Sequence, residues 1–208
     1  MNYIDGQFVA LPRITKLNKL KLQYKDTLTY IALRSFNGSE GCFPSYEAIA
    51  TKAKCSRNFI MASLKRLEQS GLINVNRFKR RLVKDRLPVN EYTFKRFDSF
   101  DPIPYEIFDT DLDLHDKAML LSIIQFFYNS KMKPLYNTIM IAKELQLSTR
   151  IVQQRFRSLI ELGFIMKLNI PRSRRRFGCK YELSSKVNWI WKLGKIKSED
   201  TTSLLMVG

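Results

Sequence analysis

Histidine is almost missing from the 208 residues, and this scarcity limits the chemistry that the chain can support. An enzyme that cleaves DNA with a metal held by paired histidines beside a tyrosine nucleophile cannot be built around the single His115. A glycine-rich phosphate loop of the P-loop type is also lacking, which excludes a helicase motor within the chain. We therefore expect no catalytic site, no metal and no cofactor, and we interpret His115 as an ordinary surface residue.

Cysteines and long apolar runs are scarce as well. Cys42, Cys55 and Cys179 are odd in number and far apart in the sequence. Their spacing matches neither a zinc site nor a redox pair, so reduced thiols are expected. No apolar run approaches the roughly 20 residues that span a bilayer, and residues 1–13 lack the basic and apolar regions of an export signal. These absences predict a cytoplasmic protein.

Acidic side chains are few in comparison with basic ones. The chain has 36 lysines and arginines against 19 acidic residues, a net charge of +17, and the first half holds the larger share of the excess. Such an imbalance favours a polyanionic partner. A membrane surface is the rival to nucleic acid, but the basic residues are not gathered on one long amphipathic helix. Nucleic acid is the better interpretation, with no membrane partner.

Residues 43–73 have the pattern of a helix-turn-helix that continues into a strand. Ser45 is suited to cap the first helix and Ser56 the second, and Gly71 is suited to end it in the left-handed conformation. The second helix has apolar residues at helical spacing on one face, whereas its other face is basic and polar and carries Arg57, Asn58, Met61 and Lys65. Two amphipathic helices in any small helical protein are the alternative interpretation.

The same pattern returns later in the chain without a gap. Residues 135–165 repeat residues 43–73 at a constant offset of 92 positions, which pairs Ile49 with Ile141, Ser56 with Ser148 and Gly71 with Gly163. The offset also pairs Phe8 with Phe100 and Pro12 with Pro104 in the segments that precede the helices. A repeat of this length indicates a duplicated unit and makes two unrelated helix pairs a poor explanation.

The second reading helix is predicted to begin after Ser148. Its outer face carries Thr149, Arg150, Gln153, Gln154 and Arg157. Arginine contacts guanine through two hydrogen bonds, and glutamine contacts adenine in the same way. The first helix, with Phe59, Met61 and Ala62, partly lacks this chemistry. We therefore expect the second helix to read bases and the first half to supply more of the phosphate attraction.

A basic two-stranded ribbon, or wing, is expected after each helix-turn-helix. The first wing has strands near residues 72–78 and 89–94, and its tip carries Lys79, Arg80, Arg81, Lys84 and Arg86. The second wing carries Arg172, Arg174, Arg175, Arg176 and Lys180. A charge run can simply be solvated, but cations at the tip of a ribbon favour contact with phosphates or the minor groove.

The fold prediction is mainly α with small β wings (α+β): two tandem winged helix-turn-helix domains, residues 1–97 and 98–192, followed by a flexible tail, residues 193–208. Residues 7–14 are expected to form a short strand, and Leu28 and Phe36 to lie on the buried stripe of the first helix. An acidic run from Asp101 to Asp116 precedes the corresponding helix of the second unit. Asp113 is expected to cap that helix, and the remaining acids to face the basic first unit or a protein.

From the segments PSYEAIA through SGLI, the chain resembles the winged-helix domains of plasmid and bacteriophage replication proteins, and its duplication resembles tandem winged-helix replication initiators. The resemblance covers residues 8–191 in outline. It implies an origin-binding initiator in a bacterial host cell, with double-stranded DNA, a host replication protein and a second copy of the chain as partners. In such initiators the first domain is usually larger, whereas both units are nearly equal here.

Two other functions fit the same residues. Winged-helix transcriptional regulators share the local pattern, and a viral inhibitor could use such domains to cover a host nucleoprotein. For the tandem initiator, one chain is expected to cover two neighbouring major-groove segments about 10 base pairs apart, whereas a repressor working as a symmetric dimer would prefer an inverted repeat. No palindrome is required by the sequence argument, and direct repeats would recruit several chains.

Overall fold

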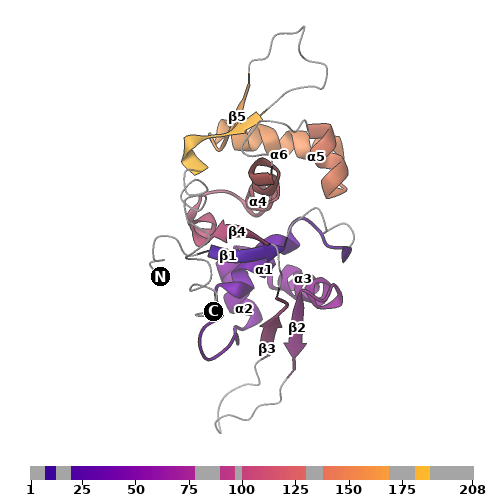
Figure 1. Ribbon diagram of the computed structural model, residues 1–208, viewed down its shortest axis with the longest axis vertical. Coiled ribbons are helices and arrows are strands. Elements are labelled where there is room, and N and C mark those ends of the chain that lie inside the picture. The colour runs from indigo at the N-terminus through magenta and orange to yellow at the C-terminus, as the bar shows by residue number, and fades with distance from the viewer. Residues whose placement is uncertain are drawn as a thin grey trace.

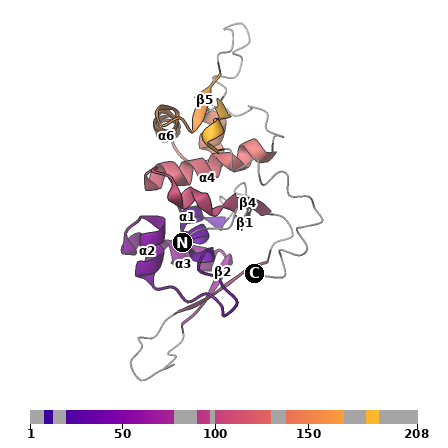
Figure 2. The ribbon, with the colours of Figure 1, turned by 90° about the vertical axis from the view of Figure 1, so that its left-hand side faces the viewer.

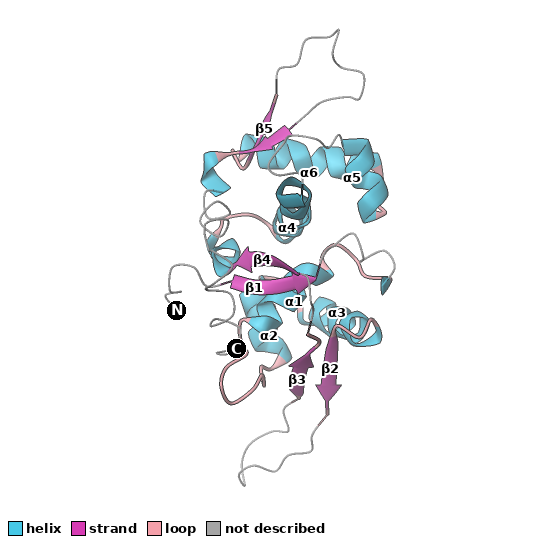
Figure 3. Cartoon of the chain, in the orientation of Figure 1, coloured by secondary structure: helices cyan, strands magenta, loops and turns pink. Residues whose placement is uncertain are grey.

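The computed structural model describes residues 8–12, 20–77, 90–96, 100–129, 138–168 and 181–187. Within these ranges, helices dominate and the strands form three separate antiparallel pairs, β1 with β4, β2 with β3 and β5 with β6 (Figures 1 and 3). This agrees with the predicted class, mainly α with small β elements.

The first half contains the predicted helix-turn-helix. Helix α1 spans Asp26–Arg34, α2 Tyr46–Ala53 and α3 Arg57–Gln69, and strands β2 (Ile73–Asn76) and β3 (Glu91–Phe94) form the base of the expected first wing. The Ser45 hydroxyl accepts a hydrogen bond from the Ala48 amide, and the Ser56 hydroxyl from the Phe59 amide. Both helix starts are therefore set by the local capping chemistry that the sequence predicted.

The second half repeats these bounds. Helix α5 spans Thr138–Leu145 and α6 Thr149–Glu161, each 92 positions after its equivalent, with β5 (Ile165–Lys167) and β6 (Tyr181–Leu183) as the second strand pair. Left-handed backbone conformations also repeat at this offset: they occur at Lys54 and its equivalent Gln146, and at Gly71 and its equivalent Gly163. The helix bounds and left-handed positions of the second half therefore match those of the first at the same offset.

Two equivalent strands and two equivalent helices meet between the halves. Strand β1 (Phe8–Pro12) pairs antiparallel with β4 (Phe100–Pro104), and α1 packs against α4 (Leu114–Asn129). The sequence predicted β1 but not β4, because the two prolines of FDPIP argue against a strand. Pairing with β1 overrides that local preference. A short 3-10 helix, Tyr105–Asp109, connects β4 to the segment before α4.

Helix α1 is buried on nearly all sides, as is the first part of α4. Every residue from Asp26 to Leu33 is buried, and so is every residue from Asp116 to Ile124. The buried apolar residues of both halves form one contiguous cluster. The apolar residues of α4 between Ala118 and Ile124 therefore pack inside the molecule. The proposed domain boundary at residue 97 stays a prediction.

One expectation about a single residue was wrong. Phe36 was placed on the buried stripe of α1, but α1 ends at Arg34 and the Phe36 side chain is 37% exposed. His115, expected at the surface, is partly exposed, and its Nδ1 lies 3.2 Å from the Tyr24 Oη of the first half. Burial is the main cause that lowers the pKa of His115.

None of the helices among the described residues is both long and apolar enough to cross a bilayer.

Candidate nucleic-acid interface

The outer face of α3 is exposed as predicted. Arg57, Asn58 and Lys65 are exposed, and the Met61 side chain is 41% exposed. Ile60, Leu64 and Leu67 are buried on the opposite face. The face is therefore available for contact with a partner.

Phe59 does not belong to that outer face, which corrects the sequence interpretation. It is half-buried and packs against the core, and the Lys25 ammonium lies over its ring at 5.3 Å. Met61 and Ala62 remain on the exposed side. The chemistry of the first reading face is therefore more polar than the sequence suggested.

Arg57 is held in place by neighbouring side chains from α2 and α3. Its Nε donates to Glu47 Oε1, one of its terminal nitrogens lies 3.3 Å from Met61 Sδ, and its guanidinium lies over the Tyr46 ring at 5.5 Å. The pKa of Glu47 is lowered, first by hydrogen bonding to its own backbone amide and then by Arg57. Glu47 is therefore ionised and partly neutralises the cation at the start of α3.

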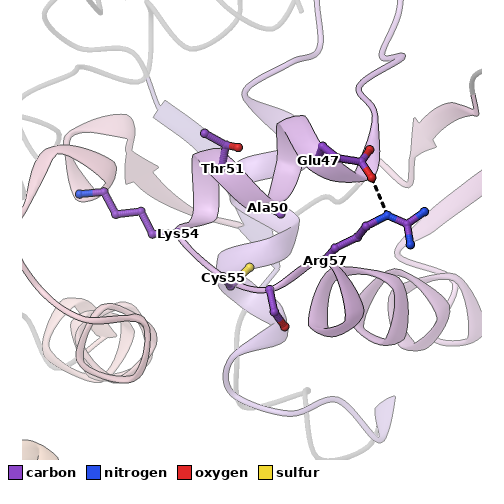
Figure 4. Close-up of a pocket in the computed structure, with 7 residues that line it drawn as sticks. Glu47, Ala50, Thr51, Lys54, Cys55 and Arg57 are labelled. Atoms are coloured by element: carbon purple, nitrogen blue, oxygen red, sulfur yellow. Dashed lines mark hydrogen bonds and ion pairs between the residues drawn. The ribbon is translucent and has the colours of Figure 1, made fainter.

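An open hollow of about 500 Å³ lies at the turn between α2 and α3. In Figure 4, Arg57 and Glu47 stand at one end of the hollow, Lys54 stands at the other, and Cys55 lies between them. Burial raises the pKa of the Cys55 thiol to about 11, so this thiol is protonated at neutral pH. One end of the hollow is the Arg57–Glu47 ion pair and the other is the Lys54 side chain, and we treat the hollow as part of the α3 surface.

Each position on the outer face of α6 has an equivalent on α3, 92 residues earlier in the chain. Arg150, Gln153, Gln154 and Arg157 are exposed, and Thr149 is half-buried. Arg150 stands at the position of Asn58, Gln153 at that of Met61 and Arg157 at that of Lys65. The second face therefore presents arginine and glutamine where the first presents asparagine, methionine and lysine.

Exposed apolar side chains lie near the starts of α5 and α6. Ile139 is 64% exposed, Met140 47% and Ile151 40%. Ile139 occupies the position of Glu47, and Thr149 that of Arg57, so the ion pair of the first unit has no counterpart at this position. The two units thus differ in chemistry beside the reading helix as well as on it.

A buried carboxylate fixes α3 to α1. Asp26 is fully buried and accepts hydrogen bonds from Ser63 Oγ at 2.7 Å and from Arg66 Nε at 2.8 Å and Nη2 at 2.7 Å. A bidentate arginine contact sets both the distance and the angle between partners. The hydrogen bonds to Asp26 raise the pKa of Arg66 above its ordinary value.

The second unit contains the same three side-chain types in exchanged positions. Asp116, buried on α4, accepts from Ser158 Oγ and from an Arg155 terminal nitrogen at 3.3 Å. Arg155 stands where Ser63 stands in the first unit, and Ser158 where Arg66 stands. Helices α3 and α6 are therefore each oriented by an aspartate–serine–arginine contact to the helix beneath them.

Sequence reasoning missed these contacts. Ser63 and Arg66 were not singled out, and Asp116 was noted only as the last residue of the acidic run. The available signal was a serine and an arginine three positions apart, in exchanged order, in both copies of the repeat. Only the packing of α1 on α3 and of α4 on α6 shows which acid they contact.

The predicted wing tips lie outside the described residues. This applies to Lys79, Arg80, Arg81, Lys84 and Arg86, and to Arg172, Arg174, Arg175, Arg176 and Lys180. Trp189, Trp191 and the C-terminal tail lie outside them as well. At the base of the first ribbon, Arg77 pairs with Glu68 at 2.6 Å and the Arg34 guanidinium lies over the Phe94 ring at 4.5 Å. The predicted cap of α4 is confirmed, since Asp113 Oδ1 accepts a hydrogen bond from the Asp116 amide at 2.6 Å.

No group of three or more metal-binding side chains gathers within the part of the chain that the structure describes.

Comparison with known protein families identifies a helix-turn-helix domain at residues 20–73. This range covers α1, α2, α3 and the first residue of β2. No curated protein matches the chain, and no solved structure does. The helix-turn-helix of the first half therefore rests on sequence pattern, structure and family, and it indicates DNA as the partner.

Proposed function

We propose that this chain is a sequence-specific double-stranded DNA-binding protein without a catalytic site of its own, and that it acts as an origin-binding replication initiator. The observation that carries DNA binding is the exposed polar and cationic face of α3 within the recognised helix-turn-helix domain. The equivalent face of α6 supports a second contact on the same duplex. The initiator role rests on the resemblance of the duplicated pattern to tandem winged-helix initiators.

A transcriptional regulator is the second candidate. The antiparallel pairing of β1 with β4 favours it, because this pairing relates the two halves of the chain by a two-fold rotation. Two helix-turn-helix units in such an arrangement suit an operator with inverted half-sites. A protein that covers a host nucleoprotein is the third candidate. The exposed Ile139, Met140 and Ile151 favour it, since apolar side chains on a surface commonly contact protein.

Footprinting of the purified chain across the genome that encodes it tests the proposal. An initiator should protect a cluster of sites next to an easily melted segment and promote strand opening or helicase loading there. Protection of a promoter with repression of transcription would instead support the regulator. Tight protein binding without any DNA complex would support the third candidate and defeat the proposal.

A further inference from the structure

We propose that one chain binds a DNA site whose two half-sites are inverted relative to each other, with the molecule's own pseudo-two-fold axis placed on that of the site. The proposal rests on the proposed function, because it requires both helix-turn-helix units to bind duplex DNA. It concerns the orientation of the two reading helices within one chain, which the sequence alone left open.

The register of β1 and β4 provides the first observation. Phe8 and Pro12 correspond to Phe100 and Pro104 in the repeat. In the structure, Phe8 pairs with Pro104, Pro12 with Phe100, and Ala10 with its own equivalent Pro102. A strand that pairs antiparallel with its own copy, centred on equivalent residues, is related to that copy by a local two-fold rotation. A simple translation of the unit along the chain cannot produce this register.

The helices beneath the strands agree with this relation. Helix α1 packs on α4, which is its equivalent in the repeat. Contact between equivalent surfaces is the property of a two-fold, isologous interface, whereas head-to-tail packing joins different surfaces. Beside these helices, Tyr24 meets His115, and the repeat equivalents of these two residues are Asp116 and Gln23, their immediate neighbours in sequence.

The overall arrangement of the molecule extends the two-fold relation to the two helix-turn-helix units. Figure 1 shows the β2–β3 pair toward one end of the long axis and β5 toward the other, with β1, β4 and α4 between them. In Figure 2, α2 and α6 lie toward one side of the molecule, and β1 and β4 lie toward the other. Both helix-turn-helix units are thus displaced to one side, with their ribbons at opposite ends. A duplex along that side would meet the two units in opposite orientations.

Two-fold related reading helices require two-fold related half-sites, because the backbone of a duplex has its own two-fold axes and each helix enters the groove in the same way. The base sequences of the halves need not match. Asn58, Met61 and Lys65 face one half, and Arg150, Gln153 and Arg157 face the other. The expected site is therefore inverted in geometry and unequal in sequence. Direct repetition of whole sites, each filled by one chain, is compatible with this arrangement.

Site-directed cleavage of DNA measures the orientation without knowledge of the base contacts. Single cysteines carrying an iron chelate are introduced at Lys54→Cys or Gln146→Cys, just before the reading helices, and at Gln69→Cys or Glu161→Cys, at their ends. All four residues are exposed and lie outside the proposed base-reading set. The background protein carries Cys55→Ala and Cys179→Ser, while Cys42, which is fully buried, is retained. The DNA is a duplex selected by the full chain from a random library.

The inverted arrangement predicts that the cleavage sites of the labelled positions lie along the duplex in a mirror order. If the starts of the two helices face the centre of the site, the order is 69, 54, 146 and 161; if their ends face the centre, it is 54, 69, 161 and 146. Light scattering should show one chain per duplex, and reversal of one half-site in place should weaken binding by about tenfold or more. A repeated order, 69, 54, 161 and 146, or two chains per site overturns the inference while DNA binding stands. Failure of the unlabelled chain to bind any duplex overturns the proposed function and the inference with it.

Discussion

At the scale of single residues, the two reading faces differ most at three equivalent positions. Asn58, Met61 and Lys65 on α3 correspond to Arg150, Gln153 and Arg157 on α6, and all six are exposed. Arginine and glutamine can each make two hydrogen bonds to one base edge, which methionine cannot. The α6 face should therefore contribute more to discrimination between sequences than the α3 face.

Replacement of Arg150 or Gln153 by alanine should cost about 1–3 kcal/mol of binding free energy on the selected site and much less on random DNA. Met61→Ala, at the position equivalent to Gln153, is the matched control and should change the preference little. Fluorescence anisotropy with both duplexes measures the effect. Equal losses on the two DNAs would show that Arg150 and Gln153 contact phosphates.

Glu47 should weaken DNA binding in the present chain, because it places a carboxylate on Arg57 at the start of α3. The Glu47→Gln variant removes that charge and leaves the guanidinium available to a phosphate, so affinity should rise by about two- to fivefold. Glu40→Gln removes an exposed acid in the turn after α1 and is the control for the general gain in positive charge. Equal gains in both variants would contradict a specific role for the pair.

At the scale of the elements, the buried aspartates determine how the reading helices sit on the helices beneath them. Asp26 is fully buried, and its oxygens contact both Ser63 and Arg66. Removal of one partner of a buried ion pair leaves the other charge without compensation, which makes such contacts sensitive to substitution. The orientation of α3 therefore depends on a single carboxylate in α1.

Asp26→Asn should lower the free energy of unfolding by about 3–5 kcal/mol, because Arg66 then keeps a partly buried charge without its carboxylate. The control is Asp113→Asn, since the Asp113 side chain is 57% exposed in its pair with Arg155 and asparagine still caps a helix. That variant should lose about 1 kcal/mol or less. Urea denaturation followed by circular dichroism gives both values, and similar losses would contradict the assigned role of Asp26.

The helix-turn-helix elements were predictable because their limits are set locally. Ser45, Ser56 and Ser148 each cap the helix that follows, and Gly71 and Gly163 each adopt the left-handed conformation. Strand β4 was missed because its own residues, FDPIP, include two prolines, although the repeat offset already aligned residues 100–104 with the predicted strand at residues 8–12. The partners of Asp26 and Asp116 were hidden because each contact joins two helices far apart in sequence.

At the scale of the whole molecule, the contact between the halves includes a buried lysine. Lys117 on α4 is 2% exposed, and its Nζ donates to the Phe108 carbonyl oxygen at 3.0 Å. Lys52 of the first half lies over the Phe108 ring at 5.0 Å. Burial, followed by the charge of Lys54, lowers the pKa of Lys117 to about 8, although Asp109 and Asp111 oppose the shift. The contact therefore contains a group that titrates near physiological pH.

The lowered pKa of Lys117 predicts a specific pH dependence. The unfolded chain keeps this lysine protonated up to about pH 10, whereas the folded chain releases the proton from about pH 8, so its contribution to stability rises with pH in between. Relative to Lys117→Met, the unaltered chain should gain about 1 kcal/mol of unfolding free energy between pH 7 and 9. Comparison of the two proteins cancels the opposing effect of Cys42 and Cys55, whose pKa values burial raises. A constant difference across that range would place Lys117 in a more solvated site.

Binding of both units to one duplex should make the affinity strongly dependent on salt. The net charge of +17 and the exposed cations of α3 and α6 supply the contacts, together with the arginines and lysines that the sequence assigns to the wing tips. With about six to ten phosphates engaged, the affinity should fall by roughly three to five decades between 50 and 200 mM salt, because each neutralised phosphate releases counterions.

The double variant Lys65→Ala, Arg157→Ala removes one cation from the same position of each unit and should reduce the slope of log affinity against log salt by about two units. If each single variant lowers the slope by about one unit, both units engage the duplex together. A slope that changes with only one of them would confine binding to one half of the molecule, and an almost flat salt dependence would defeat the electrostatic argument for DNA as the partner.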